Sequence, residues 1–352
     1  MASDLPKVTV CVPVRNGART ISRTLDSILI QDYPNFEIIV SDNCSTDETA
    51  KIVKEYAERG VRYYFNPKLE KCGESNWNNI LSLAEGPLIA LYHADDLYMP
   101  TMLRKQVVFL TANPDVSAVF TMMQRIDEND NPIRMGAMNL PKELQGQNRF
   151  AFSEYFNALL KYSTFTPVPT MMTRRKVLDK VGNFHWQKFT SASDVDLYLR
   201  MARQWGPIGV IDEPLHCYRI SGWQGTAMIN KGRINLADFY TSIDAHLKDS
   251  EENQVVKPQS LACYKMYRAA DEVLCVQNLL VLGKVSETRE RLRKAMTFRY
   301  FLTALNYPKT LVRLSAGLVL LISINLRLGF FVGRGMSCAY EWVHTWQRKP
   351  IK

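Results

Sequence analysis

The first sixty residues of the chain alternate between β-rich apolar runs and amphipathic stretches of helical length. Residues 7–14 and 36–40 are apolar runs rich in β-branched side chains, and the amphipathic stretches 18–31 and 45–58 follow them. Strand, helix, strand, helix is the order typical of a parallel α/β sheet flanked by helices. Ligands of such sheets gather where the strands end. The sequence therefore predicts an α/β fold, Rossmann-like and mostly parallel, with its site at that edge of the sheet.

Two adjacent carboxylates, Asp95 and Asp96, follow the next apolar run, residues 88–91. Neighbouring carboxylates at the exit of a buried strand repel each other and resist desolvation unless a cation or hydrogen-bond donors lie beside them. The pair therefore suggests a divalent metal site. The alternative is a helix N-cap, because residues 97–110 have the pattern of a helix with Pro100 in its first turn.

Three ordered blocks of the chain resemble the family 2 glycosyltransferases, which have the nucleotide-sugar-binding GT-A fold. The blocks are residues 13–49 (PVRNGARTISRTLDSILIQDYPNFEIIVSDNCSTDET), 72–103 (CGESNWNNILSLAEGPLIALYHADDLYMPTML) and 191–202 (SASDVDLYLRMA). Three blocks in the right order are a strong signal, whereas any one alone would be weak. The resemblance implies an inverting glycosyltransferase with a GT-A domain over residues 1–230.

The resemblance also implies roles for particular side chains. Asp42 would recognise the base of the nucleotide, Asp95 would face the ribose, and Asp96 would bind Mg²⁺ or Mn²⁺. Such a cation stabilises the charge on a leaving nucleoside diphosphate. Asp194 would be the catalytic base that deprotonates the acceptor hydroxyl. The other nucleotide-sugar-binding residues that the resemblance implies are Pro13, Arg15, Asn16, Asn76 and Arg219.

Several of these residues also have a purely structural interpretation. Asp42 is suited to an Asx turn before Ser45, and Asp194 is suited to cap a helix over 195–204 or to complement its dipole. His93 stands where many relatives have another aspartate. A single histidine without a second imidazole at ligand spacing is weak support for a metal ligand.

The C-terminal part of the chain carries its positive charge. Residues 284–352 contain 13 Lys or Arg and 3 Asp or Glu, a surplus of ten, while the net charge of the whole chain is +9. Such segments bind acidic surfaces, and the uncharged apolar run 314–326 favours lipid over nucleic acid. A membrane span needs about 20 residues, so the run is short. Three placements of residues 311–332 stay open: helices in the membrane surface, which we prefer, a buried structural helix, and a true span.

We therefore expect a metal-dependent glycosyltransferase that moves a hexosyl or related group from a UDP-sugar to a glycan or lipid-linked acceptor in polysaccharide or glycoconjugate synthesis. A helical, basic region over 231–352, with membrane-associating helices at about 284–352, would dock on the anionic inner face of the cell membrane from the cytoplasm. Trp342 and Trp346 resemble interfacial anchors. Seven scattered cysteines without a CxxC pair, and no secretory signal at residues 1–6, agree with a reducing compartment.

Two alternatives remain at this point. One is a transferase for a soluble or protein acceptor, in which the C-terminal region serves as an oligomer contact. The other is a catalytically inactive carbohydrate-binding scaffold of the same fold. We expect no nucleic-acid partner.

Overall fold

The computed structural model describes residues 5–69, 73–221, 232–285, 287–326, 328–329 and 331–337. Backbone contacts divide the chain into two compact units. The first comprises Met1–Pro132, Gly136–Phe156 and Thr164–Arg219, and the second comprises Ile133–Met135, Asn157–Ser163 and Ile220–Lys352. The boundary predicted at residue 230 lies outside the described residues and stays a prediction.

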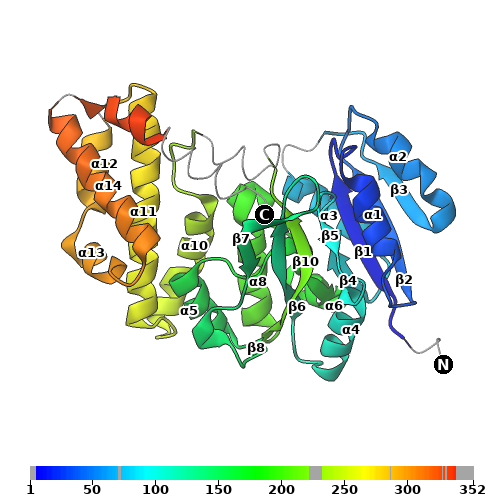
Figure 1. Ribbon diagram of the computed structural model, residues 1–352. Coiled ribbons are helices and arrows are strands. Elements are labelled where there is room, and N and C mark those ends of the chain that lie inside the picture. The colour runs from blue at the N-terminus through cyan, green and yellow to red at the C-terminus, as the bar shows by residue number, and fades with distance from the viewer. Residues whose placement is uncertain are drawn as a thin grey trace. The chain divides into compact units, whose positions relative to one another are not determined.

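The first unit is built on a mixed sheet in which most neighbouring strands near the N-terminus are parallel (Figure 1). Strands β3, β2, β1 and β4 run parallel in that order, and β9, which is antiparallel to both of its neighbours, joins β4 to β6. Strand β10 pairs with β6 in parallel and with β5 and β8 in antiparallel, and β7 pairs with β6. The strands are β1 (Val8–Val14), β2 (Phe36–Asp42), β3 (Val61–Phe65), β4 (Leu88–Leu91), β5 (Leu97–Tyr98), β6 (Ala118–Ile126), β7 (Pro132–Met138), β8 (Arg149–Phe150), β9 (Met172–Arg174) and β10 (Ile208–Arg219).

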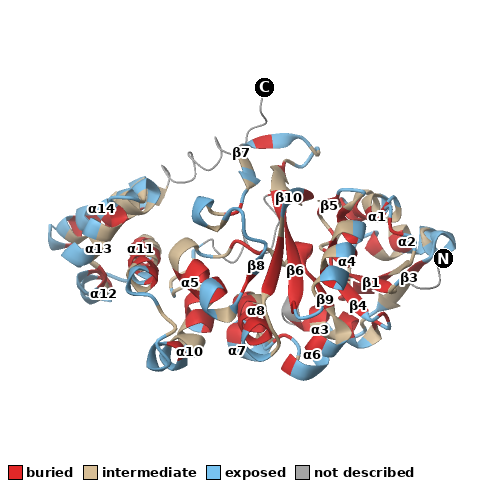
Figure 2. Cartoon of the chain, turned by 90° about the horizontal axis from the view of Figure 1, so that it is seen from below, coloured by how far each residue is buried: buried red, intermediate tan, exposed pale blue. Residues whose placement is uncertain are grey.

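Helices cover both faces of this sheet, with α1 and α4 on one face and α3, α6 and α8 on the other (Figure 2). Strands β1 and β4 are buried along nearly their whole length, as expected for parallel strands covered on both sides. The predicted fold class, a mostly parallel sheet flanked by helices, is confirmed. The helices are α1 (Ile21–Leu29), α2 (Thr49–Glu55), α3 (Gly73–Leu83), α4 (Met102–Ala112), α5 (Phe152–Tyr162), α6 (Arg175–Val181), α7 (Trp186–Phe189) and α8 (Ser193–Gln204), with 3₁₀ turns at Ala57–Arg59, Lys142–Leu144, Val168–Thr170 and Thr190–Ala192.

One predicted helix begins later than its sequence pattern suggested. Leu97 and Tyr98 form strand β5, which pairs with β10, and helix α4 starts only at Met102. Strand pairing with a distant segment overrides the local helical pattern, and Pro100 precedes the helix instead of lying in its first turn. Asp95 and Asp96 therefore do not cap α4, whose N-cap residue is Thr101. The N-cap interpretation of the pair is wrong.

Apart from Ile133–Met135, which belong to strand β7, the regular secondary structure described in the second unit is helical, and the predicted helical C-terminal region is confirmed. Helix α11 lies at its centre and packs against α12, α13 and α14. Buried apolar side chains of α11, such as Val273 and Val276, meet Leu292 of α12 and Leu320 of α14. The helices are α10 (Asp238–Glu252), α11 (Pro258–Val281), α12 (Thr288–Ala295), α13 (Phe298–Ala304) and α14 (Pro308–Asn325).

A close backbone approach at Gly206 yields a stability test of the first unit. A Cβ atom at this position would lie 2.2 Å from the carbonyl oxygen of Asp115, so one backbone segment must move. We predict that Gly206→Ala lowers the free energy of unfolding by about 1–3 kcal/mol in urea titrations. Gly335→Ala is the control, because nothing lies within 4 Å of its added Cβ. Equal stabilities of the two variants would contradict the close approach.

Candidate active site

Three turns meet at the carboxyl edge of the sheet. Strand β1 lies between β2 and β4 and is parallel to both, so the residues that follow these three strands emerge side by side. The register pairs Val14 with Asp42 and Cys11 with Leu91. The turn after β1 carries Arg15 and Asn16, and the turn after β4 carries the two adjacent aspartates. The sheet therefore brings the predicted donor-binding and metal-binding residues to one edge.

The turns after β1 and β2 are joined by hydrogen bonds. The peptide N–H of Asn16 donates to Ser45 Oγ at 2.9 Å, and Asn16 Oδ1 accepts the N–H of Thr46 at 2.8 Å. The N–H of Gly17 donates to Thr49 Oγ1 at 2.8 Å. Asn16 adopts a left-handed backbone conformation with φ of 51°, which Asn tolerates better than most residues. The side chain of Asn16 thus holds two turns in place.

Next to this junction, Arg15 is exposed and Pro13 is half-buried in β1. Among the described residues, none forms a hydrogen bond or ion pair with the guanidinium of Arg15. Its cation is therefore available to an anionic ligand at this edge of the sheet.

Asp42 is fully buried, and both of its carboxylate oxygens accept hydrogen bonds. Oδ1 accepts the N–H of Ser45 at 2.8 Å, and Oδ2 accepts the hydroxyl of Tyr63 at 2.8 Å. Burial and the neighbouring carboxylate raise the pKa of Tyr63, which keeps its hydroxyl protonated. The turn interpretation of Asp42 is thus realised. A carboxylate has about four lone-pair sites, so acceptor capacity remains, and contact with a nucleotide base stays a prediction.

Asn76 supports the same strand from helix α3. Its amide nitrogen donates to the carbonyl of Ser41 at 2.9 Å, and its amide oxygen accepts the Ser41 hydroxyl at 2.8 Å. Asn76 is almost fully buried. The structure therefore gives Asn76 a bracing role beside Asp42, and a direct contact with the donor stays a prediction.

The carboxylate of Asp96 is fully buried and held by donors from strand β10. Oδ1 accepts the peptide N–H of Arg219 at 2.8 Å, and Oδ2 lies 2.8 Å from His216 Nε2. Burial raises the pKa of Asp96 to about 6 and lowers the pKa of His216 to about 3. His216 is therefore neutral, and we assign its proton to Nε2 from the hydrogen bond to Asp96.

An aromatic stack lies against this pair. The ring of Tyr98 is 5.3 Å from His216 and 3.8 Å from Tyr92, and it stacks on both. The Tyr98 hydroxyl accepts the N–H of His93 at 2.6 Å. The stack fixes the short segment between β4 and β5, so the aspartate pair has little freedom to rearrange.

His93, Asp95 and Asp96 form a cluster that could hold a metal ion, with ligand atoms within 4.8 Å of one another. Two carboxylates and one imidazole suit Mn²⁺ or Mg²⁺, which complete their shells with water and phosphate oxygens. His93, whose ring centroid lies 5.6 Å from that of Trp77, thus joins the two carboxylates in one cluster, although a single histidine in the sequence is weak support for a metal ligand. Asp95 is half-buried and Asp96 fully buried, so Asp95 presents the more accessible carboxylate. Metal binding by Asp96 stays a prediction.

The guanidinium of Arg219 lies behind this cluster and is fully buried. Its Nε donates to the carbonyl of Asp95 at 2.7 Å, and Nη1 donates to the carbonyl of Asp127 at 3.0 Å. Nη1 also forms an ion pair with Asp130 at 2.5 Å, and Asp130 pairs with Arg23 at 2.8 Å. Arg219 thus positions the Asp95 backbone and the β6–β7 turn. A direct contact between Arg219 and the donor, which the resemblance implied, stays a prediction.

Asp194 lies in the first turn of α8 and is half-buried. The N-cap residue of α8 is Ala192, so Asp194 does not occupy the cap position. Burial raises the pKa of Tyr155 and Tyr198, and the nearby charge of Asp194 adds to this effect. The assignment of Asp194 as the catalytic base stays a prediction.

The next acid of the same helix has a structural role. Asp196 is buried and pairs with Arg200 at 2.8 Å and with His185 at 3.0 Å. Arg200 also donates to the carbonyl of Asn183 at 2.7 Å, which ties α8 to the segment before α7. Asp196 is thus committed to the fold.

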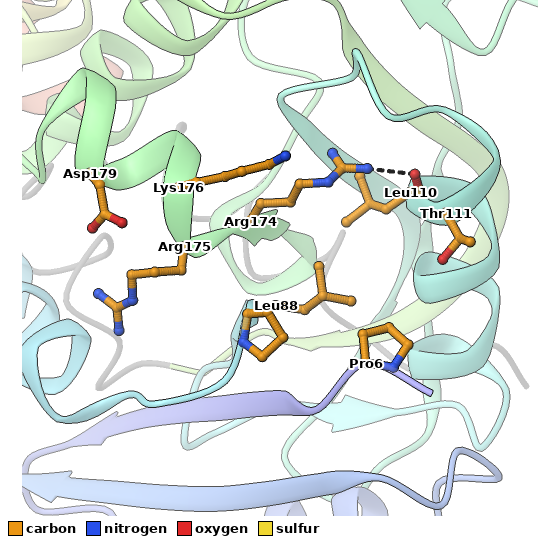
Figure 3. Close-up of a pocket in the computed structure, with 9 residues that line it drawn as sticks. Pro6, Leu88, Leu110, Thr111, Arg174, Arg175, Lys176 and Asp179 are labelled. Carbon is orange, nitrogen blue, oxygen red and sulfur yellow. Dashed lines mark hydrogen bonds between the residues drawn. The ribbon is translucent and has the colours of Figure 1, made fainter. Parts of the chain in front are cut away.

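A cavity of about 480 Å³ lies at the opposite edge of the sheet, where β4 begins (Figure 3). Pro6, Leu88 and Leu110 line it together with the basic side chains of 174–176. The guanidinium of Arg174 donates to the carbonyl of Leu110 at 2.5 Å, and that of Arg175 donates to the carbonyl of Leu81 at 2.8 Å. Two of the three cations thus donate to backbone carbonyls.

Comparison with known proteins agrees with this geometry. The sequence profile of "Glycosyl transferase family 2" matches residues 9–182. An uncharacterized glycosyltransferase of Methanocaldococcus jannaschii is 29% identical over 220 residues, which cover 62% of this chain and 72% of that protein. EpsE of Bacillus subtilis, which is also named as a glycosyltransferase, is 39% identical over 126 residues, 35% of this chain and 45% of EpsE.

Solved structures share the fold. S. aureus TarS 1-349 in complex with UDP-GlcNAc superposes with a TM-score of 0.60 at 18% identity, covering 91% of this chain and 92% of that one. The mannosyltransferase PcManGT from Pyrobaculum calidifontis, in complex with GDP-Man and Mn²⁺, superposes with a TM-score of 0.50 at 18% identity and covers 98% of this chain and 85% of its own. The sheet and its flanking helices are therefore GT-A-like.

The contrast between the two aspartates can be tested by substitution. Asp96→Asn replaces a carboxylate that accepts two buried hydrogen bonds, so we predict a loss of about 1–3 kcal/mol in the free energy of unfolding. Asp95→Asn should change stability by less than about 0.5 kcal/mol, because its side chain is partly exposed. Both should lower turnover of the sugar donor. Wild-type stability of Asp96→Asn in thermal unfolding would refute the buried network.

Proposed function

Residues 9–182 of this chain form a glycosyl transferase family 2 domain, and from this premise we propose an inverting, metal-dependent transfer of a hexosyl or related group to a lipid-linked or membrane glycan. Glycosyltransferases of this family use nucleotide sugars. The observation that carries the proposal is the cluster of His93, Asp95 and Asp96 at the carboxyl edge of the sheet, beside the turns of Asn16 and Asp42. An inactive scaffold would have no need for three potential metal ligands gathered at this edge of the sheet.

We propose that the donor is a UDP-sugar. TarS was solved with UDP-GlcNAc and PcManGT with GDP-Man, so the fold accepts either base. In this chain the spare acceptor capacity of Asp42 suits the imide N–H of uracil. The exposed guanidinium of Arg15, on the neighbouring turn, would face the diphosphate.

The reaction follows from the positions of the acids. Asp194 would take the proton of the acceptor hydroxyl while its oxygen attacks the anomeric carbon from the face opposite the diphosphate, so the configuration inverts. The bond between the anomeric carbon and the phosphate oxygen breaks at the same time, and the nucleoside diphosphate leaves. A Mg²⁺ or Mn²⁺ ion held by Asp96, with Asp95 and His93 beside it, would neutralise charge on the diphosphate. Arg219 and His216 would keep those carboxylates in place.

We further propose that the second unit docks on the inner face of the cell membrane. Helix α14 buries one side against α11 and leaves a second apolar side in solvent, which we call the apolar stripe: Val312, Val319, Ile322 and Leu326, between 52% and 70% exposed. Their spacing of seven, three and four residues places them on one face. A helix that is apolar on both sides is typical of contact with lipid or with another protein.

The charge of this region supports lipid as the partner. Residues 284–352 carry a surplus of ten positive charges, which anionic headgroups attract. By length and composition, α14 is also the one described helix that could cross a membrane, a test that core helices of soluble proteins pass as well. The predicted anchors Trp342 and Trp346 lie outside the described residues. A second copy of the chain on the apolar stripe is the alternative, and it would accompany a soluble acceptor.

The role of Asp194 can be separated from donor binding. We predict that Asp194→Asn leaves the Kd for donor with Mn²⁺ within about twofold but lowers the rate of transfer by about 10²–10⁴, the range typical of a lost general base. Isothermal titration and a transfer assay provide the two readouts. Asp179→Asn, an exposed acid on α6, should leave both values unchanged. If Asp194→Asn loses stability and donor affinity while a transfer rate remains, the carboxylate serves the helix and is not the base.

The apolar stripe can be tested with liposomes. We predict that Val319→Asn with Ile322→Asn lowers sedimentation of the full chain with phosphatidylglycerol liposomes at least fivefold, because both side chains would leave lipid. Val108→Asn is the matched control, since Val108 is 61% exposed on α4 of the first unit. Absence of liposome binding by the wild type would reject membrane docking. A change from dimer to monomer in the double variant would support the second-copy alternative.

A further inference from the structure

Three buried hydroxyl side chains lie near Asp194 in the first unit. Tyr198 belongs to the same helix, α8, while Tyr155 comes from α5 and Thr166 from the segment that follows α5. All three residues are fully buried, whereas Asp194 is half-buried. A buried polar group costs free energy unless it has a hydrogen-bond partner. Each of these hydroxyls therefore needs a partner.

Two of the three hydroxyls satisfy each other. The hydroxyl oxygens of Tyr155 and Thr166 lie 2.6 Å apart, which is an ordinary length for a hydrogen bond between two hydroxyls. The ring of Tyr155 also packs edge-on against Phe165, with centroids 5.5 Å apart. Tyr155 and Thr166 are thus paired with each other, and neither is the partner of the Tyr198 hydroxyl.

The hydroxyl of Tyr198 has no hydrogen-bond partner among the described residues. Its ring packs edge-on against Phe120, with centroids 4.8 Å apart, and this contact involves no hydrogen-bond acceptor of ordinary strength. Burial raises the pKa of Tyr198 well above its usual range, so the hydroxyl is protonated and can donate. A fully buried donor without a partner is rare in folded proteins and points to a function.

Asp194 is the carboxylate that this donor can reach. The two residues are four positions apart on α8, so their side chains lie on one face of the helix. Long helical side chains point back toward the N-terminus, which directs the ring of Tyr198 over the turn that carries Asp194. After burial, the charge of Asp194 is the largest cause of the raised pKa of Tyr198, as expected for neighbours. Asp196, the other acid of this turn, is already paired with Arg200 and His185.

We propose that Tyr198 is a positioning residue for Asp194. When an acceptor is bound, the Tyr198 hydroxyl would donate to the Asp194 carboxylate, directly or through one water. Catalytic hydrogen bonds are often long in the free enzyme and tighten only in the complex with substrate. The donor would hold the carboxylate in one orientation and favour its ionised form, which a base needs before it takes a proton. The inference rests on the proposed function, in which Asp194 deprotonates the acceptor hydroxyl.

The assay measures release of UDP from UDP-GlcNAc or UDP-glucose with Mn²⁺, with water in place of the acceptor. Water attacks the anomeric carbon and loses its proton to Asp194, the bond from that carbon to the phosphate oxygen breaks, and UDP leaves. The same base is thus tested without knowledge of the acceptor. If the wild type releases UDP from neither donor, both the proposed UDP-sugar donor and this inference are rejected.

Tyr198→Phe removes only the hydroxyl, so we expect kcat to fall about tenfold while KM for the donor stays within about twofold. The thermal midpoint should not fall, because the hydroxyl has no hydrogen bond to lose among the described residues. Tyr33→Phe is the matched control, since Tyr33 is 4% exposed and its hydroxyl donates to the carbonyl of Pro6 at 2.6 Å. The control should lower the thermal midpoint and leave kcat unchanged. If Tyr198→Phe behaves like the control or like the wild type, the proposal is overturned.

A double variant separates this inference from the proposed function. Because Tyr198 would act through Asp194, Tyr198→Phe should change kcat less than about twofold once Asp194→Asn is present. Equal losses in both backgrounds would show a general structural effect and refute the positioning role. If Asp194→Asn alone keeps the wild-type kcat, the proposed base is wrong and the inference falls with it. If Asp194→Asn is slow but Tyr198→Phe is not, only the inference fails.

Discussion

The buried carboxylate of Asp96 is the interaction on which the candidate site depends. An ionised group in a dry environment persists only if hydrogen-bond donors surround it, and here His216 and the peptide N–H of Arg219 supply them from the end of β10. The two ends of this contact are 123 residues apart in the chain. The segment after β4 can therefore take its shape only when β10 has joined the sheet. Folding of the sheet and assembly of the site are one event.

The side chains around this carboxylate fall into two groups: those that hold the backbone of the site in place and those that would contact a ligand. Arg219 and Arg23 fix the β6–β7 turn, and Asn76 braces the strand that ends at Asp42. These contacts are made with other groups of the protein. Arg15 is exposed, and Asp95 and His93 are half-buried, so all three side chains reach the surface of this edge of the sheet. A nucleoside diphosphate and its metal would thus contact few mobile side chains, and the groups behind these side chains are held in place by hydrogen bonds. Low reorganisation of this kind is what stabilisation of a charged leaving group requires.

The sequence could predict the fold class and the edge of the sheet that carries the site, because apolar periodicity and the position of polar residues after strands are local signals. It could not predict strand β5, whose residues have a helical pattern but pair with β10. The roles of His216 and Tyr63 cannot be predicted from the sequence for a similar reason. Each lies in a strand that carries other polar side chains, so nothing local singles it out, and its importance comes from a carboxylate brought to it only by the tertiary fold. Arg219 was visible as a cation, but only its burial shows which groups it holds.

The turns after β1 and β2 share hydrogen bonds through Asn16, Ser45 and Thr46, so neither turn has a shape of its own. Free energies of substitution at such positions do not add, because each change alters the partner of the other. Substitutions in one turn alone would mostly weaken the hydrogen bonds that hold both turns. Diversification of donor preference in a chain of this kind should therefore proceed by paired replacements, and residues 16, 45 and 46 should vary together from one descendant to the next.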